Sequence, residues 1–293
     1  MGTIVRVALV LVLVVAIAGC GDSGGPGTTS GATVASSAAT STTESTTPPA
    51  AATTTTTTSG STTSSTSSTT TTVTLPPTPI VDTIVNDTDV ADPPIDIESR
   101  EPVVSGLGAA SQAAVNQAIR DIVDPRRNQF IADVSSSHDP TLGLPGSSYW
   151  LEFEVGVATP EVLSIMFSES IYYEGAAHPT TQMFSITLDP QTGAVFALAD
   201  VLIPGTIGAL ALAVEQRVID DVYGGDSAAF ASWMSGVPPE LLYAWAVTPT
   251  GVQIGFSQYD VGPSALGPQT VVVPYGELAG VVDPAGPAGG LIP

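Results

Sequence analysis

The sequence predicts an α+β fold, in which a mostly antiparallel sheet carries two main helices packed on it. Residues 149–157 alternate between apolar and polar side chains, which is typical of a strand with one buried face. Two other stretches, 105–123 and 207–223, repeat their apolar residues every three or four positions, as amphipathic helices do. Two apolar runs that flank Thr248-Pro249-Thr250-Gly251 indicate a β-hairpin.

The chain is expected to begin with an export signal over residues 1–19. Arg6 precedes an apolar run from Val7 to Ala18, which is shorter than the ~20 residues that a membrane-spanning helix needs. The run ends in Ile17-Ala18-Gly19-Cys20, which resembles the lipobox of bacterial lipoproteins. That resemblance implies cleavage before Cys20, lipidation of its thiol and a position at the cell membrane, facing outside the cytoplasm. An ordinary cleaved signal followed by a stray cysteine is the alternative.

A Ser/Thr/Pro-rich segment, residues 20–79, is expected to form a disordered tether. From Thr28 to Thr74, 33 of 47 residues are Ser or Thr, and the only charged residue is Glu44. Such a segment has too little apolar surface to offset the entropy that ordering it would cost. Its simplest role is to hold a folded domain away from the bilayer.

Residues 80–283 are expected to form one α+β domain, followed by a flexible Pro/Gly-rich tail over residues 284–293. Pro125 is expected to kink or restart the first helix, because proline cannot donate to the helical hydrogen-bond ladder. In chain order, the expected elements are an extended acidic segment (80–102), a helix (105–123), strands (149–157, 162–173 and 182–188), a helix (207–223), hairpin strands (242–247 and 252–256), a strand (269–273) and a short helix (274–278).

Composition excludes several classes of function. The chain has 28 acidic residues against six arginines and no lysine, and its formal net charge of −22 argues against nucleic-acid binding. One cysteine excludes an intrachain disulfide framework, and two histidines leave little material for a metal cluster. The acidic run from Asp87 to Glu98 lacks the glycine that a calcium loop needs, so a solvated segment is the default. No cofactor, metal site or catalytic group is expected.

Several motifs resemble the RsiV-like extracytoplasmic domain family, formerly a domain of unknown function. Tyr173-Glu174-Gly175-Ala176-Ala177-His178 is similar to its Tyr-x-Gly-Gly-Ala-His signature. Three further segments match in the same order, and the resemblance spans roughly residues 95–282. These segments are Leu188-Asp189-Pro190-Gln191-Thr192-Gly193 with Leu198-Ala199-Asp200-Val201-Leu202, then Phe256 to Gly267, then Val271 to Leu278.

The resemblance implies a sensing or binding role. The family includes lysozyme-sensing anti-sigma factors, the N-terminal part of some peptidoglycan deacetylases and a secreted immunogenic protein of mycobacteria. This sequence lacks the sigma-binding segment and transmembrane helix of the first group and the metal-binding catalytic domain of the second. We therefore expect the binding half of such proteins, placed on a lipid anchor.

Five residues are candidate ligand contacts: Tyr173, Glu174, His178, Tyr259 and Asp260. The first three lie in the signature segment, and the last two open a long connection that the family resemblance marks as a loop. A purely structural turn is the alternative for Glu174 and His178. His138 has no partner evident in the sequence.

The expected function is therefore non-enzymatic binding or sensing at the cell envelope, with a cationic lysozyme-type hydrolase or peptidoglycan as the partner. An acidic surface accelerates encounter with cationic partners, although acidity also serves solubility. One alternative is a cell-wall glycan hydrolase that would use Glu174 and a second carboxylate such as Asp260. The other is a passive structural envelope lipoprotein.

Overall fold

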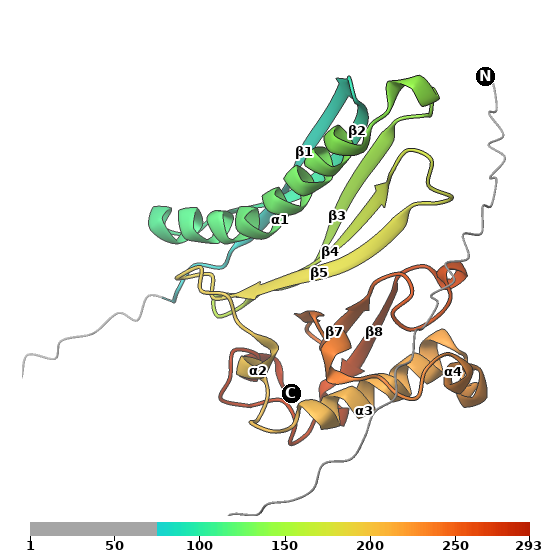
Figure 1. Cartoon of the computed structure of the whole chain (residues 1–293). Coiled ribbons are helices and arrows are strands. Elements are labelled where there is room, and N and C mark those ends of the chain that lie inside the picture. The colour runs from blue at the N-terminus through green and yellow to red at the C-terminus, as the bar shows by residue number, and fades with distance from the viewer. Residues whose placement is uncertain (1–74) are drawn as a thin grey trace, which may run out of the picture. The chain divides into compact units, whose positions relative to one another are not determined.

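The computed structural model describes residues 75–293. The expected signal peptide, Cys20 and the tether up to residue 74 lie outside the described residues. From Ile80 onward the chain forms two β-sheets and their covering helices (Figure 1).

The larger sheet has five strands in the order β1-β2-β3-β4-β5. Its neighbouring strands are antiparallel except for β2 and β3, which run parallel. A parallel pair needs a crossover connection, and helix α1 supplies it. The strands are β1 (Ile80–Ala91), β2 (Pro94–Ser105), β3 (Ser147–Ala158), β4 (Leu163–Tyr172) and β5 (Thr180–Leu188).

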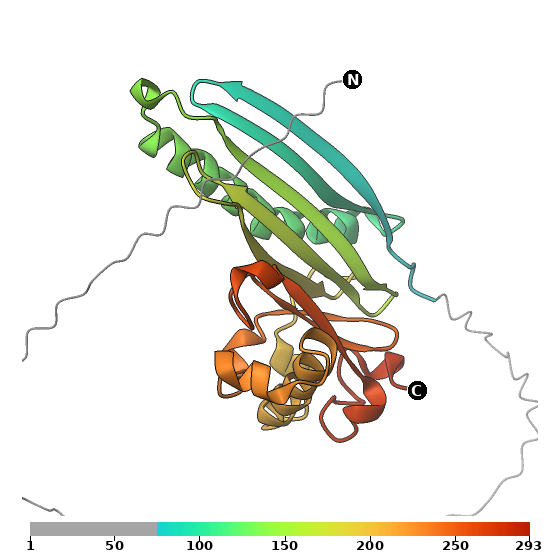
Figure 2. The ribbon, with the colours of Figure 1, turned by 90° about the vertical axis from the view of Figure 1, so that its right-hand side faces the viewer.

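Helix α1 (Ala109–Ser137) covers one face of this sheet (Figures 1 and 2). It runs beyond the expected end at residue 123 and continues through Pro125 without a restart, and its ribbon bends near the middle, in keeping with the expected kink. An interior proline costs about 3 kcal/mol relative to alanine. The apolar face packs against the sheet on both sides of the proline and offsets that cost. The buried residues of the helix are Val115, Ile119, Val123, Phe130 and Val134.

The smaller sheet has three antiparallel strands, β6 (Ala244–Val247), β7 (Gly251–Phe256) and β8 (Gln269–Pro274). Helix α3 (Ile207–Arg217) packs against β8 and continues into a π-helical turn at Val218–Val222. The shorter α2 (Leu198–Val201) and α4 (Ser227–Trp233) belong to the same layer. Single 3₁₀ turns lie at Pro140–Leu142, Pro239–Leu241, Ser264–Leu266, Tyr275–Glu277 and Gly289–Leu291.

The α+β class and the central strands are confirmed, with three differences of detail. The extended acidic segment is the hairpin β1–β2, and the last three strands form a sheet of their own rather than joining one sheet. Helix α4 was not expected, although the Asp226 carboxylate caps it by accepting hydrogen bonds from Ala228 and Ala229 N–H.

Residues 284–293 differ from the frayed end that their composition suggested. Ala288 is fully buried, and Leu291 and Ile292 pack against the core of the smaller sheet.

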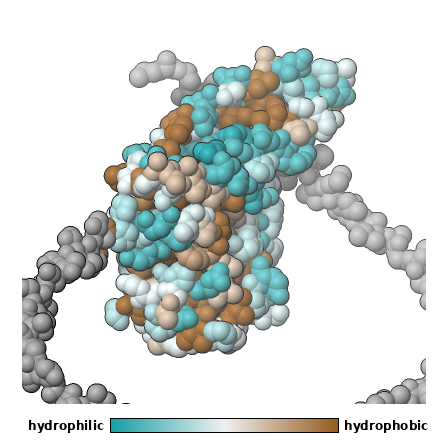
Figure 3. Space-filling view, turned by 90° about the vertical axis from the view of Figure 1, so that its left-hand side faces the viewer, coloured by the Kyte–Doolittle hydropathy of each residue, from teal (hydrophilic) through white to brown (hydrophobic). Residues whose placement is uncertain are grey.

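On the face of the molecule drawn in Figure 3, hydrophilic residues are interspersed with apolar ones.

The smaller sheet packs on the face of the larger sheet that α1 leaves free. Met166 and Met183 of the larger sheet meet Ala244 and Ala246 of β6. Gly156 allows the close approach, because a Cβ atom there would lie 2.5 Å from the Val247 carbonyl oxygen.

Two serines bridge the sheets by hydrogen bonds. The Trp245 N–H donates to Ser185 Oγ at 2.8 Å, and the Val247 N–H donates to Ser164 Oγ at 3.0 Å. Both N–H groups belong to β6, which is an edge strand of the smaller sheet. The serines therefore satisfy backbone donors that no strand of the smaller sheet can reach.

Replacing Ser164 by alanine should lower the free energy of unfolding by about 1–3 kcal/mol, because the Val247 N–H would be left buried without an acceptor. Urea denaturation followed by circular dichroism measures this change. Ser168→Ala on the same strand is the matched control, since Ser168 is less buried and has no side-chain hydrogen bond among residues 75–293. Equal midpoints for the two variants would show that the Ser164 bridge contributes nothing.

Candidate functional site

One end of the larger sheet collects the residues that the sequence predicted as ligand contacts. The strand register places Ile95 opposite Ser147, Ser148 opposite Tyr172 and Ile171 opposite Thr180. The β1–β2 turn, the start of β3 and the β4–β5 connection (residues 173–179) therefore share this end.

Tyr173 and Glu174 lie against the C-terminal part of α1. The Tyr173 ring centroid is 5.6 Å from that of Phe130, and its hydroxyl donates to Asp133 at 3.3 Å. Burial, followed by the Asp133 carboxylate, raises the pKa of Tyr173 above its ordinary value. The Glu174 carboxylate lies 2.9 Å from His138 Nδ1, and both side chains are largely buried. His138 thus has a partner that the sequence did not suggest.

His178 and Tyr259 meet on the surface although 81 positions separate them. The Tyr259 hydroxyl lies 3.3 Å from His178 Nε2, and the ring centroids are 6.5 Å apart. The Gln258 N–H donates to the Thr181 carbonyl at 2.9 Å, and the Thr181 N–H donates to Gln258 Oε1 at 3.2 Å. These two bonds attach the connection after β7 to the start of β5.

Asp260 holds the turn that presents Tyr259. Its carboxylate accepts hydrogen bonds from the Ser257 N–H at 2.7 Å and from the Tyr243 hydroxyl. Burial, followed by the hydrogen bond to Asp260, raises the pKa of Tyr243 above its ordinary value. Among residues 75–293, Tyr259 is the only non-glycine with a positive φ, at 77°. An exposed aromatic in that strained conformation points to a functional role.

The two carboxylates considered for a hydrolase have different partners. Glu174 is engaged by His138, whereas Asp260 is engaged by Ser257 and Tyr243. Within the part of the chain that the structure describes, they share no hydrogen-bond partner.

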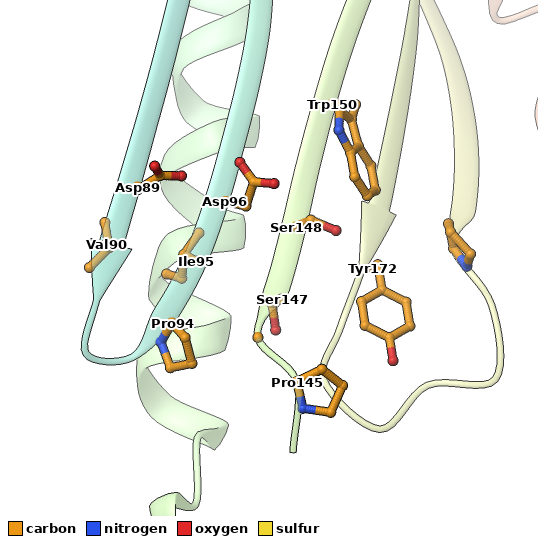
Figure 4. A pocket seen from close by; sticks show the side chains of 12 residues that line it. Asp89, Val90, Pro94, Ile95, Asp96, Pro145, Ser147, Ser148, Trp150 and Tyr172 are labelled. Atoms are coloured by element: carbon orange, nitrogen blue, oxygen red, sulfur yellow. The ribbon is translucent and has the colours of Figure 1, made fainter. Parts of the chain in front are cut away.

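Beside these loops lies a pocket of about 820 Å³ on the face of the larger sheet opposite α1 (Figure 4). Sequence reasoning did not identify it. It is lined by Asp89, Val90, Pro94, Ile95, Asp96, Pro145, Gly146, Ser147, Ser148, Trp150, Tyr172 and Pro179. Pro179 adjoins His178, so the pocket borders the loop pair formed by residues 173–179 and 257–262.

The sequence contained enough information to predict one wall of this pocket, but not the other. The alternation in β3 places Ser148 and Trp150 on one face together with Glu152 and Glu154. The missing information was the pairing of β1 with β2, which brings carboxylates at distant positions of the acidic run opposite each other.

Residues 75–293 contain no group of three or more His, Cys, Asp or Glu side chains placed to hold a metal ion. Nor does any helix in that range combine the length and the hydrophobicity needed to cross a membrane.

Comparison with known protein families finds a match to part of the chain. Residues 199–276, which run from α2 to the end of β8, match the DUF3298 family, described as proteins of unknown function. Tyr259 and Asp260 lie inside this range, whereas Tyr173, Glu174 and His178 lie before it. Among curated proteins, no match was found.

Two solved structures share the fold. A DUF3298 family member from Bacteroides fragilis matches with a TM-score of 0.57 and 13% identity, covering 74% of this chain and 97% of that one. A DUF3298 family protein from Pseudomonas aeruginosa matches with a TM-score of 0.52 and 17% identity, covering 72% of this chain and 95% of that one. The chain therefore contains a DUF3298 domain and has the fold of DUF3298 family proteins, in agreement with the RsiV-like resemblance of its motifs.

Proposed function

We propose that this protein is a lipid-anchored binding protein of the cell envelope that captures a cationic protein of the lysozyme type and performs no chemistry of its own. The observation that carries the proposal is the loop pair: Gln258 attaches residues 257–262 to Thr181 at the start of β5, directly after residues 173–179, and Tyr259 contacts His178 on the surface.

The geometry of the loop pair suits a binding surface. Tyr259 is 47% exposed, and hydrogen bonds through Gln258 and Asp260 hold the backbone on both sides of it. A rigid exposed tyrosine offers a large contact area at low entropic cost, which is why such residues serve as binding anchors.

The charge of the domain supports a cationic partner. All acidic residues except Asp22 and Glu44 lie from Ile80 onward, and so do all arginines except Arg6. A strongly negative surface accelerates encounter with positively charged proteins, and salt screens the attraction. Lysozyme-type hydrolases are cationic, and the RsiV-like family includes lysozyme receptors.

The anchor follows from the lipobox-like end of the signal sequence at Cys20. Acylation would hold the protein at the membrane without a spanning helix, and the Ser/Thr-rich segment would carry the binding domain outward. A bound partner would thus be retained close to the cell surface.

Isothermal titration of the full chain with hen egg-white lysozyme at low ionic strength should show saturable binding. The affinity should fall as sodium chloride is raised from about 20 to 200 mM, since the Debye length shortens to less than half over that range. Titration with purified peptidoglycan under the same conditions is the comparison. The absence of lysozyme binding at low salt would contradict the proposed partner.

Replacing Tyr259 by glycine should weaken lysozyme binding by about three- to tenfold while leaving the thermal midpoint within a few degrees. Glycine adopts the positive φ without strain, which offsets its greater entropy in the unfolded chain and keeps the loop in place. Trp233→Ala is the matched control, because Trp233 is a similarly exposed aromatic, at 43%, in α4. If Tyr259→Gly binds like the unaltered chain, the loop pair does not form the contact surface.

Replacing Cys20 by serine should abolish incorporation of an alkyne-palmitate label and move the protein out of the membrane fraction, because the acylated thiol is missing. Ser23→Ala, which keeps the cysteine, is the control and should stay in the membrane fraction. Identical labelling and fractionation of both variants would exclude an anchor at Cys20.

A further inference from the structure

Two rows of side chains cross the face of the larger sheet opposite α1. In the first row, Asp89 lies opposite Asp96, Asp96 opposite Ser148, and Ser148 opposite Tyr172. In the second row, Asp87 lies opposite Glu98 and Glu98 opposite Trp150. Each row therefore runs from two carboxylates to an aromatic ring.

The four carboxylates form two like-charge cross-strand pairs. Such pairs destabilise a sheet, and all four side chains are exposed. No arginine or histidine of residues 75–293 forms a salt bridge with any of them. Arg100, the next basic residue on β2, is already paired with Glu152 at 2.8 Å. This repulsion is therefore not relieved within the described part of the molecule.

Ser148 supplies a separate indication of a ligand. It is only 8% exposed, it lines the pocket, and none of the described residues forms a hydrogen bond with its Oγ. Its hydroxyl is directed toward the side of the pocket where Trp150 and Tyr172 lie, whereas Asp96 lies on the other side (Figure 4). An unpartnered hydroxyl on a largely buried serine that lines the pocket is suited to bind a polar group that enters it.

We propose that this pocket, the acidic pocket, binds basic side chains, arginine above all, of a cationic polypeptide. The inference rests on the proposed function for the class of partner and adds the chemistry by which that partner is recognised. Carboxylates form short charge-assisted hydrogen bonds with a guanidinium group, and the Trp150 and Tyr172 rings attract the same cation and cover its aliphatic stem. The Ser148 hydroxyl accepts one further N–H.

The same residues suit a metal ion poorly. Among residues 75–293 no set of three potential ligands is arranged around one point, and the far wall of the pocket is aromatic. Calcium requires six to eight oxygen ligands, which two facing aspartates cannot supply. An organic cation uses both walls of the pocket.

The test titrates the full chain with the peptide acetyl-Gly-Arg-Gly-Arg-Gly-amide and with the same peptide carrying citrulline in place of arginine. Citrulline keeps the shape of arginine but lacks its charge. We expect saturable binding of the arginine peptide and at least about tenfold weaker binding of the citrulline peptide, since charged hydrogen bonds are the stronger class. Equal affinity for the two peptides, or binding of neither, would overturn the inference.

Variants assign the binding to the pocket. Asp96→Asn should weaken binding of the arginine peptide by about tenfold and also raise the thermal midpoint by roughly 1–4 °C, because it removes the repulsion from Asp89. A variant that is more stable yet binds less well cannot be explained by misfolding. Asp221→Asn is the matched control, since it makes the same charge change at an exposed position of the turn after α3. An equal loss of peptide affinity in both variants would show that the effect depends only on the net charge of the protein, and would overturn the inference.

Comparing peptide binding with lysozyme binding separates this inference from the proposed function. If lysozyme binds all variants equally while the arginine peptide fails to bind, the pocket assignment is wrong and the proposed function stands. If the peptide binds in an Asp96-dependent manner and lysozyme does not bind, the pocket assignment stands and the lysozyme-type partner is wrong. A calcium titration to about 1 mM tests the metal alternative. Calcium binding by the unaltered chain that disappears in Asp96→Asn would show that the pocket binds a metal ion, and would overturn the inference.

Discussion

The hydrogen bonds from β6 to Ser164 and Ser185 fix the arrangement on which the rest of this structure depends. An edge strand has N–H groups that point away from its own sheet, and burying them requires acceptors. The two serines provide these acceptors on the free face of the larger sheet, at the end where Gly156 lets the backbones approach closely. Because β6 is fixed there, β7 ends beside β5, and the next residues of the chain reach Thr181.

The packing of the smaller sheet leaves the two faces of the larger sheet with different surroundings. One face is covered by α1 and forms one of the two large apolar cores, the other lying around the smaller sheet. The other face is covered by the smaller sheet at one end only, where Met166 and Met183 are buried. At the opposite end Trp150 and Tyr172 remain beside the pocket, together with Asp89 and Asp96. Repulsion between the facing carboxylates lowers the stability of the fold at this end, and the two apolar cores offset that loss. Binding sites commonly carry such a cost in stability.

The sequence was informative where one side of an element is buried. Strand β3 was predicted from the alternation around Trp150, and the buried face of α1 from the spacing of Val115 and Ile119. The predicted end of the helix at residue 123 was too early, because the apolar face of α1 continues to pack on the sheet beyond Pro125.

The candidate site was predicted only where one segment of chain contains it. Glu174 and His178 stood out in the signature segment, but the partners of both, His138 and Tyr259, come from distant parts of the sequence. The acidic run was visible as composition, whereas its facing pairs depend on the register of a hairpin that periodicity could not fix. Long-range juxtaposition of this kind requires the fold.

Hydrogen–deuterium exchange of the full chain, with and without saturating lysozyme, tests the central claim most directly, because it locates a contact surface without any substitution. Protection should appear in residues 86–98, 147–151, 173–179 and 257–262, which make up the acidic pocket and the loop pair, and should be absent from α3 and α4. Protection confined to α3 and α4, or no protection at all, would contradict the assignment of this end of the sheet as the binding surface.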